Sequence, residues 1–263
     1  MAKIVITDVT DQVATVTLNR PNVLNALDDE LAKALHENLQ TVAADDRIRC
    51  VVINGAGDNF MAGGDLQFFR ERLPEIRATE GRDLTAMFEH VHGTIRVIRE
   101  MPKPVVASVR GAAAGFGLSL MLCCDLAIAA KSSVFTLAYC HIGASPDGGS
   151  TYFLPRVLGM KRAFEIALLG ERFDAQRAAE LGLVNRVVAD DELPQATREL
   201  AGALAKGPAA AYAKTKALLN GSLGAQLGEQ LDLERDAFVE GAQGDDFAEG
   251  VTAFCEKRKP RFA

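Results

Sequence analysis

Two glycine-rich loops carry the residues of this sequence that are best suited to chemistry on a bound ligand. The first is FMAGGDL at residues 60–66, and the second is GAAAGFGL at residues 111–118. Each follows a short apolar run and precedes a helical pattern. Small residues let a backbone approach a ligand closely, and free N–H groups at the start of a helix can hold developing negative charge. Both loops are therefore candidate sites for an anion or an oxyanion.

Neither loop has the pattern of a nucleotide-binding loop. A Walker loop would continue into Gly-Lys-Ser/Thr, and a dinucleotide loop would read Gly-x-Gly-x-x-Gly, and neither is found here. Single glycine-rich turns also occur where a strand and a helix merely pack closely. The residue types alone leave both interpretations open.

The apolar pattern predicts an α/β core that positions these loops, followed by a mostly helical C-terminal part. Leu31, Leu35 and Leu39, at a spacing of four, predict a helix that begins near Asp28, with Asp28 as its N-cap. We expect strands at residues 4–9 and 13–18 (a hairpin), 50–53, 105–109, 126–129, 134–137 and 184–188. We expect further helices at residues 82–100, 159–169, 174–181, 191–206, 208–220, 223–241 and 246–258, and one opened by residues 111–117.

Composition excludes several classes of protein. The net charge is -6 and basic residues are interspersed with acids, which argues against a nucleic-acid surface. No apolar run reaches the length of a membrane span, and the start does not have the architecture of a signal peptide. The five cysteines are irregularly spaced and the four histidines are scattered, so we expect core thiols, a reducing cytoplasmic compartment and no metal site.

Five segments, in order, resemble motifs of the enoyl-CoA hydratase/isomerase (crotonase) family, and together they cover almost the whole chain. They are LNRPNVLNAL at 18–27, FMAGGDL at 60–66, VVASVRGAAAGFGLSLMLCCD at 105–125, LPRVLGMKRAFEIALLGERFDAQRAAELGLVNRVV at 154–188, and EGVTAFCEKRKPRF at 249–262. The resemblance implies a spiral of ββα units over residues 1–195 that binds acyl-CoA. It also implies a helical trimerisation region over residues 196–263, a homotrimer or a dimer of trimers, and no cofactor beyond the coenzyme A of the substrate.

The resemblance also assigns an oxyanion hole and a CoA site. The backbone N–H groups of Gly64 and Phe116 would hold the thioester oxygen as it becomes an enolate, the second at the start of a helix. The CoA moiety would lie against the segments at 22–26 and 62–66, and against two residues of the last helix. These CoA candidates are Asn22, Ala26, Ala62, Asp65, Leu66, Phe254 and Lys257. Core packing for Phe254 and solvation for Lys257 are the plain alternatives.

Both glutamates that a hydratase of this family would use are replaced. Counting along the motifs, Ser119 and Tyr139 stand in their places. Neither is a general base at neutral pH, since the reference pKa of tyrosine is near 10. Hydration by the usual mechanism of the family is therefore not expected. Ser119, Tyr139 and Phe68 remain candidates for lining the acyl pocket.

One carboxylate lies where the family has a catalytic group in some branches. Asp147, in IGASPDGGS at 142–150, stands where the aspartate-bearing enoyl-CoA and ring-oxepin (epoxyphenylacetyl-CoA) isomerases keep an aspartate that moves a proton. In chlorobenzoyl-CoA dehalogenase the equivalent aspartate attacks the substrate ring. Pro-Asp-Gly is also a common turn. We favour an isomerase in which Asp147 is the proton shuttle.

His92 falls at the position of a helper histidine in the dehalogenase, which would favour that branch. That enzyme also needs two tryptophans around the ring, and this chain has none. His92 therefore stays a secondary candidate, because helix histidines are more often structural. A hydratase or dehalogenase-like enzyme and a catalytically silent acyl-CoA-binding homologue remain the alternatives to an isomerase.

Overall fold

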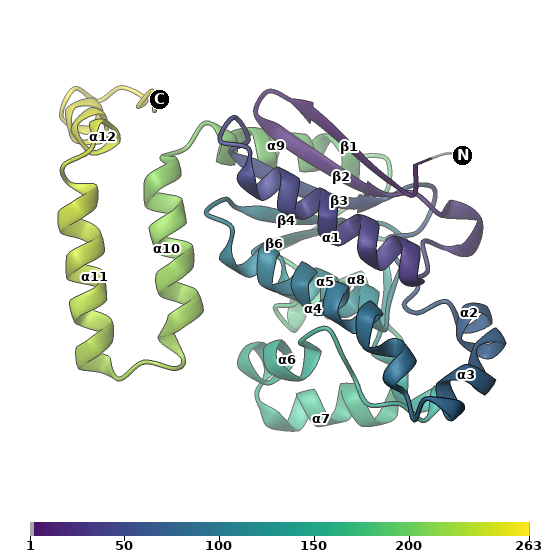
Figure 1. Ribbon diagram of the computed structural model, residues 1–263. Helices are drawn as coiled ribbons and strands as arrows, with labels where there is room; N and C mark the ends of the chain where they lie inside the picture. The colour runs from purple at the N-terminus through teal and green to yellow at the C-terminus, as the bar shows by residue number, and fades with distance from the viewer. Residues whose placement is uncertain (1–2, 263) are drawn as a thin grey trace.

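The computed structural model describes residues 3–262 and shows two sheets wrapped by helices, with a helical arm on one side (Figure 1). The larger sheet has the strand order β1-β2-β3-β4-β6-β9, and the smaller has the order β5-β7-β8. The strands are β1 (Val5–Thr10), β2 (Val13–Leu18), β3 (Cys50–Gly55), β4 (Val105–Val109), β5 (Ala112–Ala114), β6 (Leu126–Ala130), β7 (Val134–Thr136), β8 (Phe173–Asp174) and β9 (Arg186–Val188).

The helices follow the expected alternation with strands and then run consecutively toward the C-terminus. The helices before residue 170 are α1 (Asp29–Ala44), α2 (Leu66–Glu71), α3 (Leu73–Ala78), α4 (Thr85–Glu100), α5 (Phe116–Cys123), α6 (Ser150–Leu158) and α7 (Met160–Leu169). The later ones are α8 (Ala175–Glu180), α9 (Leu193–Ala205), α10 (Ala209–Ser222), α11 (Leu227–Gly241) and α12 (Asp245–Cys255). Short 3-10 turns occupy η1 (Pro21–Val23), η2 (Arg82–Leu84) and η3 (Ala138–Ile142).

The first hairpin and the first helix form as the sequence predicts. β1 pairs antiparallel with β2, and Asp11 and Gln12 at the turn adopt positive φ angles of 49° and 65°. The Asp28 carboxylate accepts a hydrogen bond from the Leu31 N–H at 2.8 Å, which confirms it as the N-cap of α1. From β2 onward the large sheet is parallel, so the ends of β3 and β4 deliver the two glycine loops to the same edge.

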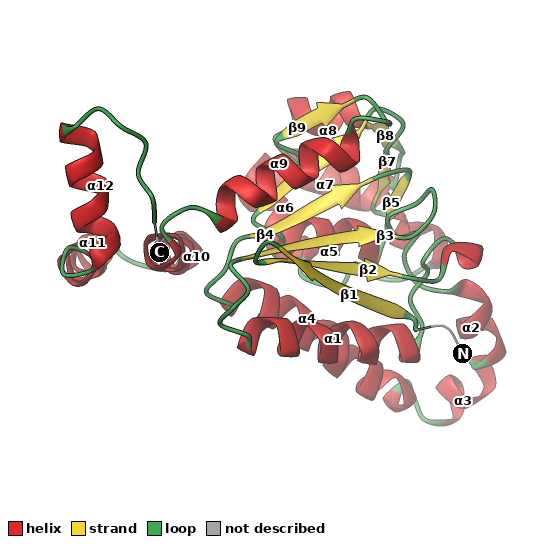
Figure 2. Cartoon of the chain, turned by 90° about the horizontal axis from the view of Figure 1, so that it is seen from above, coloured by secondary structure: helices red, strands yellow, loops and turns green. Residues whose placement is uncertain are grey.

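Helices cover both faces of the large sheet, as Figure 2 shows from above. α1 and α4 pack together on one face, where Leu31, Leu35 and Ile98 are almost completely buried. On the other face, α9 packs Ala201 and Ala205 against Val52 and Val106 of the sheet. The sheet is therefore buried on both sides, in accordance with its continuously apolar strands.

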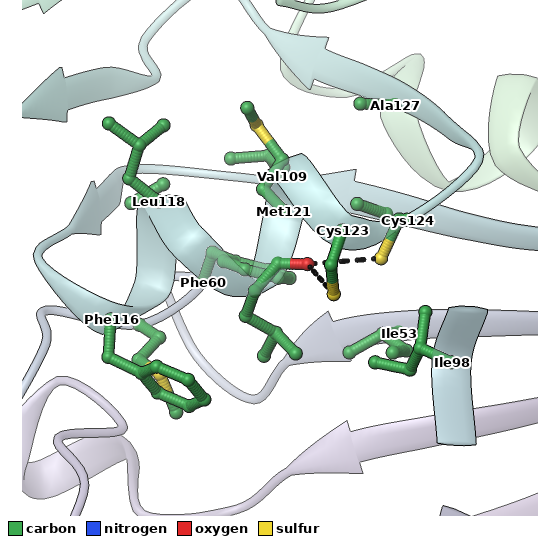
Figure 3. Packing of buried hydrophobic residues seen from close by; sticks show 14 of the residues in the cluster. Ile53, Phe60, Ile98, Val109, Phe116, Leu118, Met121, Cys123, Cys124 and Ala127 are labelled. Atoms are coloured by element: carbon green, nitrogen blue, oxygen red, sulfur yellow. Dashed lines mark hydrogen bonds between the residues drawn. The ribbon is translucent and has the colours of Figure 1, made fainter. Parts of the chain in front are cut away.

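The cysteines at the end of α5 are core residues, as expected. Figure 3 shows the Cys123 and Cys124 thiols pointing to one shared oxygen, the carbonyl of Leu120, at 3.0 and 3.3 Å. Burial raises the pKa of the Cys50 thiol in β3 to about 12. Cys50, Cys123 and Cys124 are all buried and fill space in the core.

A helical arm leaves the core after α9. The division expected after residue 195 falls inside α9, which packs on the sheet, so the part that stands apart starts with α10. α10 is fixed to the core by the buried Lys216, whose ammonium donates to the carbonyls of Ile98 and Lys103 at 2.7 and 2.9 Å and pairs with Asp125 at 2.8 Å. α11 buries none of its residues within this chain.

One local prediction was wrong, and two elements were not predicted. The helix expected to open at residues 111–117 begins only at Phe116, because Ala112–Ala114 form the short strand β5 beside β7. The sequence pattern also missed α6, which contains Pro155 in its interior, and the two-residue strand β8. No helix within residues 3–262 has the length and apolar character needed to cross a membrane.

Candidate active site

The two glycine loops pack directly against each other. Met61 of the first loop pairs with β5, donating to the Ala112 carbonyl and accepting from the Ala114 N–H, both at 2.9 Å. A Cβ atom at Gly117 would lie 2.2 Å from the Met61 carbonyl oxygen, so only glycine fits there. Close packing, the plain interpretation of the glycines, therefore accounts for Gly117, and it is also what brings the loops together.

Two backbone N–H groups at this junction have no acceptor among residues 3–262. The neighbours of Gly64 are paired, since the Gly63 carbonyl accepts from Leu27 at 2.7 Å and the Asp65 N–H donates to Leu27 at 2.8 Å. Within residues 3–262, the N–H groups of Gly64 and of Phe116, the first residue of α5, donate no hydrogen bond. A Cβ atom at Gly115 would lie 3.5 Å from the Gly63 Cα, so the donors stand on adjoining loops. Such a pair can hold an oxyanion.

A tight turn brings Asp147 to the second loop. Gly148 and Gly149 have φ angles of 59° and 80°, and a Cβ atom at Gly148 would lie 2.7 Å from the Phe116 ring. The Asp147 carbonyl accepts hydrogen bonds from the hydroxyls of Ser119 at 2.9 Å and Ser150 at 3.0 Å. The turn interpretation of Pro-Asp-Gly is thus correct, and the turn holds the carboxyl group beside the candidate oxyanion hole.

The Asp147 carboxyl group is paired with a phenol. The Tyr139 hydroxyl donates a short hydrogen bond to Oδ1 of Asp147. Burial raises the pKa of Asp147 above its ordinary value, while the Tyr139 hydrogen bond and the charge of His92 lower it. Burial and the Asp147 charge raise the pKa of Tyr139 in turn. The arrangement offers one carboxylate as a general base whose pKa lies nearer to neutrality than that of a free aspartate.

Comparisons with known proteins identify the family of this chain. The model of the family described as enoyl-CoA hydratase/isomerase matches residues 8–263. This chain belongs to the enoyl-CoA hydratase/isomerase family. It is 40% identical over 263 residues to a 1,2-epoxyphenylacetyl-CoA isomerase of Escherichia coli K12, with 100% of this chain and 99% of the relative covered. It is 32% identical over 260 residues to a trans-2-decenoyl-[acyl-carrier-protein] isomerase of Streptococcus mutans, covering 99% and 98%.

Hydratase names also occur among the relatives. A probable enoyl-CoA hydratase of Rhodobacter capsulatus is 40% identical over 260 residues, covering 97% of this chain and 96% of the relative. The crystal structure of an enoyl-CoA hydratase from Polaromonas sp. JS666 superposes with a TM-score of 0.92 at 38% identity, covering 98% and 99% of the two chains. The family and the fold predicted from the motifs are confirmed, and the chain is an enzyme of this family.

Two of the segments that the family resemblance assigned to CoA lie side by side. The Ala62 N–H donates to the Leu24 carbonyl at 3.1 Å, and Leu27 forms a parallel bridge with Gly64. Asn22 and Ala26 therefore lie on one side of this junction, and Ala62, Asp65 and Leu66 on the other. Leu66 is 55% exposed and available to a ligand, whereas Ala26 is buried.

Sequence reasoning missed the residue that ties these segments together. Arg20 pairs with Asp28 at 2.8 Å and with Asp65 at 3.2 Å, and it donates a short hydrogen bond to the Ala26 carbonyl. It thereby fixes the segment that flanks the Gly64 N–H. The signal was available, because Arg20 is the charged residue in the first family motif, LNRPNVLNAL.

His92 lies near Asp147 but does not touch it. It is exposed on α4, its ring packs 5.8 Å from that of Phe88, and with Arg96 it lines a hollow of about 450 Å³. No hydrogen bond joins His92 to Asp147, so its effect on the carboxyl pKa is purely electrostatic. Phe68 lies on α2, where its ring contacts Phe69 and Arg72.

The two CoA candidates of the last helix lie elsewhere. Phe254 of α12 is 86% exposed, and Lys257 follows the end of that helix. Figures 1 and 2 both show α12 on the far side of the molecule from α2 and the first glycine loop. Within one chain, Phe254 and Lys257 therefore do not share a site with Gly64 and Asp147.

Proposed function

We propose that this enzyme is an acyl-CoA isomerase that moves a double bond, or rearranges a ring, next to a CoA thioester. Asp147 removes a proton from a carbon conjugated with the thioester. The electron pair moves onto the thioester oxygen, which the N–H groups of Gly64 and Phe116 stabilise as an enolate. Asp147 then returns the proton to a different carbon, so that no atom is gained or lost.

The observation that carries this proposal is the isolation of one carboxylate beside the two free N–H groups. Ser119 and Tyr139, at the positions where the family resemblance puts hydratase glutamates, contribute hydroxyls that hold Asp147 instead of acids that activate water. Isomerisation requires only one group that takes and gives a proton, whereas hydration must also place a water. No cofactor beyond the coenzyme A of the substrate is needed.

The relatives suggest two kinds of acyl group. One is named for a ring substrate and another for a decenoyl chain. In the proposed mechanism either kind of acyl group would react through an enolate next to the thioester carbonyl, so the same residues would serve both. We take a linear trans-3-enoyl-CoA as the first test substrate, because its isomerised product is a conjugated enoyl thioester, which absorbs light differently.

The test compares the wild-type enzyme with Asp147→Asn in D₂O, using trans-3-enoyl-CoA thioesters of several chain lengths. The wild type is expected to form isomerised, partly deuterated product, and Asp147→Asn to lose at least about a hundredfold in kcat. Asp191→Asn, which removes an exposed carboxylate elsewhere, is the matched control and should keep full activity. Equal rates for wild type and Asp147→Asn would contradict the proposal.

The same experiment separates the alternatives. A product heavier by one water would identify a hydratase, and loss of halide from a halogenated aroyl-CoA would identify a dehalogenase-like enzyme. Tight thioester binding without turnover, unchanged in Asp147→Asn, would identify a silent acyl-CoA-binding protein.

All five cysteines are free, which supports a reducing compartment such as the cytoplasm.

We also propose that the active unit is a homotrimer or a dimer of trimers. The arm encloses an apolar groove of about 870 Å³ between α10, α11 and α12, and it exposes Leu227, Phe238 and Phe254 by 75%, 67% and 86%. Exposed apolar surface of this extent is typical of a protein interface. A second copy would cover it and would bring its own Phe254 and Lys257 to a neighbour's CoA site.

Assembly can be tested without damaging the fold of one chain. Because Phe254 is 86% exposed, replacing it by serine removes little packing within the chain. We expect Phe254→Ser to lower the mass measured by light scattering, or to raise KM for acyl-CoA with little change in thermal stability. An unchanged mass and an unchanged KM would contradict this role for α12.

A further inference from the structure

The two oxygens of the Asp147 carboxyl group have different surroundings. Oδ1 accepts the hydrogen bond from the Tyr139 hydroxyl. No side chain in the part of the chain that the structure describes donates to Oδ2. The backbone of the same residue is fixed by Ser119 and Ser150, whose hydroxyls bind its carbonyl at 2.9 and 3.0 Å. Among the side chains of residues 3–262, Tyr139 thus holds the carboxyl group at Oδ1 and none holds it at Oδ2.

The Tyr139 hydroxyl is itself held in place. The Tyr139 ring lies beside Gly115, where an added Cβ atom would be 3.9 Å away, and the backbone of η3 is closed by a hydrogen bond from Tyr139 N–H to the Leu137 carbonyl at 2.8 Å. Ser119 also interacts with the phenol. Because the pKa of Tyr139 is raised by burial and by Asp147, the phenol stays protonated and remains a donor at neutral pH.

We propose that Tyr139 is a positioning residue that binds Oδ1 of Asp147 and so leaves Oδ2 as the single oxygen that takes the proton from the substrate and returns it. This inference rests on the isomerase function proposed above. In the forward step a substrate C–H bond breaks, an O–H bond forms at Oδ2, and the electron pair moves to the thioester oxygen. In the return step the O–H bond breaks and a new C–H bond forms, which restores the carboxylate.

A positioning role predicts a specific kinetic signature. The hydrogen bond favours the ionised carboxylate, so Tyr139→Phe should make Asp147 easier to protonate. In the pH profile of kcat/KM, we expect the acid limb to move to higher pH by about one unit, and we expect kcat to fall about tenfold or more. Both magnitudes follow from the strength of a hydrogen bond to a charged group. KM should change less than about twofold, because a positioning role acts on the proton transfer and not on the binding of the thioester.

Tyr152→Phe is the matched control. Tyr152 lies on α6, is 47% exposed, and stacks against Arg156 instead of a carboxylate, so its variant should keep the wild-type profile. An acid limb that does not move in Tyr139→Phe would overturn the positioning role while the isomerase function stands. Loss of isomerase activity in the wild type itself would instead remove the proposed function.

A second substitution keeps the test valid if Tyr139→Phe folds poorly. Site-specific fluorotyrosine at position 139 keeps the shape of the side chain and makes the phenol a stronger donor. It should move the acid limb in the opposite direction, to lower pH. A limb that stays in place, or that moves up, would contradict the proposal without any change of fold.

Discussion

Gly148→Ala should displace the Asp147 carboxylate, the proposed proton shuttle, without altering any group that takes part in the proposed reaction. Gly148 follows Asp147 and is buried with a φ of +59°. A methyl group there would lie 2.7 Å from the Phe116 ring and 2.9 Å from the Ser119 Cβ. Neither neighbour can retreat easily, because both belong to α5 and are almost fully buried. The turn that carries Asp147 must therefore move outward.

The expected loss in the free energy of unfolding of Gly148→Ala has two parts. A residue with a Cβ atom in the left-handed region costs about 1–2 kcal/mol, and overpacking a filled site costs about 1–3 kcal/mol more. Gly143 isolates the first part, since its φ is +69° and nothing lies within 4 Å of an added Cβ atom. We expect Gly143→Ala to lower the free energy of unfolding by about 1–2 kcal/mol, and Gly148→Ala by about 2–5 kcal/mol.

Activity should separate the two variants further. A displacement of about 1 Å at a reacting group can cost on the order of a hundredfold in rate, so kcat of Gly148→Ala should fall by about that factor. Gly143→Ala should retain most of its kcat. The measurements are denaturant titration and steady-state isomerase kinetics on both variants. Equal stability losses and equal kcat values would refute the tight contact of the Asp147 turn with α5.

Two further predictions concern stability. The Nδ1 atoms of His36 in α1 and His90 in α4 lie 3.2 Å apart. Burial, and then the charge of His90, lower the pKa of His36. The folded state therefore binds a proton at His36 less readily than the unfolded state does. The folded state should therefore lose stability as the pH falls below the ordinary histidine pKa of about 6.5. His36→Gln should make this loss smaller, which a plot of melting temperature against pH would show. An equal slope in the wild type and in His36→Gln would refute the prediction. Lys216→Met leaves Asp125 without its ammonium partner and should cost about 3 kcal/mol in denaturant titration. Adding Asp125→Asn should recover part of that loss, and strictly additive losses would contradict the pairing.

Local sequence signals predicted the elements that local interactions determine. Asp28 as N-cap of α1 and the strand Val105–Val109 form as expected because capping and apolar runs act within a few residues. β5 was missed because Ala112–Ala114 have little strand propensity of their own. They are extended because they pair with β7, some twenty residues later in the chain. α6 was missed because Pro155 lies inside it, although tertiary packing of Phe153 and Leu154 holds the helix.

The candidate site also has some features that local sequence signals predict and others that depend on tertiary contacts. Gly64, Phe116 and Asp147 could be predicted from the motifs, and the structure brings them to adjoining loops and a turn that touches the second loop. The bond between Tyr139 and Asp147 could not be predicted, since it depends on the end of η3 and on the left-handed glycines after Asp147, which local sequence signals do not specify. Likewise, a motif cannot show whether Phe254 contributes to the CoA site of its own chain or to that of a neighbouring chain.

The exchange of acids for hydroxyls around Asp147 changes the acid–base properties of the whole pocket. Two further carboxylates beside Asp147 would raise its pKa by mutual repulsion and would spread one proton over several groups. Ser119 and Tyr139 carry no charge at neutral pH, so one group titrates in response to burial, to one phenol hydrogen bond and to the charge of the nearby His92. A water placed by two acids is not needed for a reaction that returns the proton it removes. Hydroxyls in these positions therefore favour proton transfer within one substrate over the addition of water.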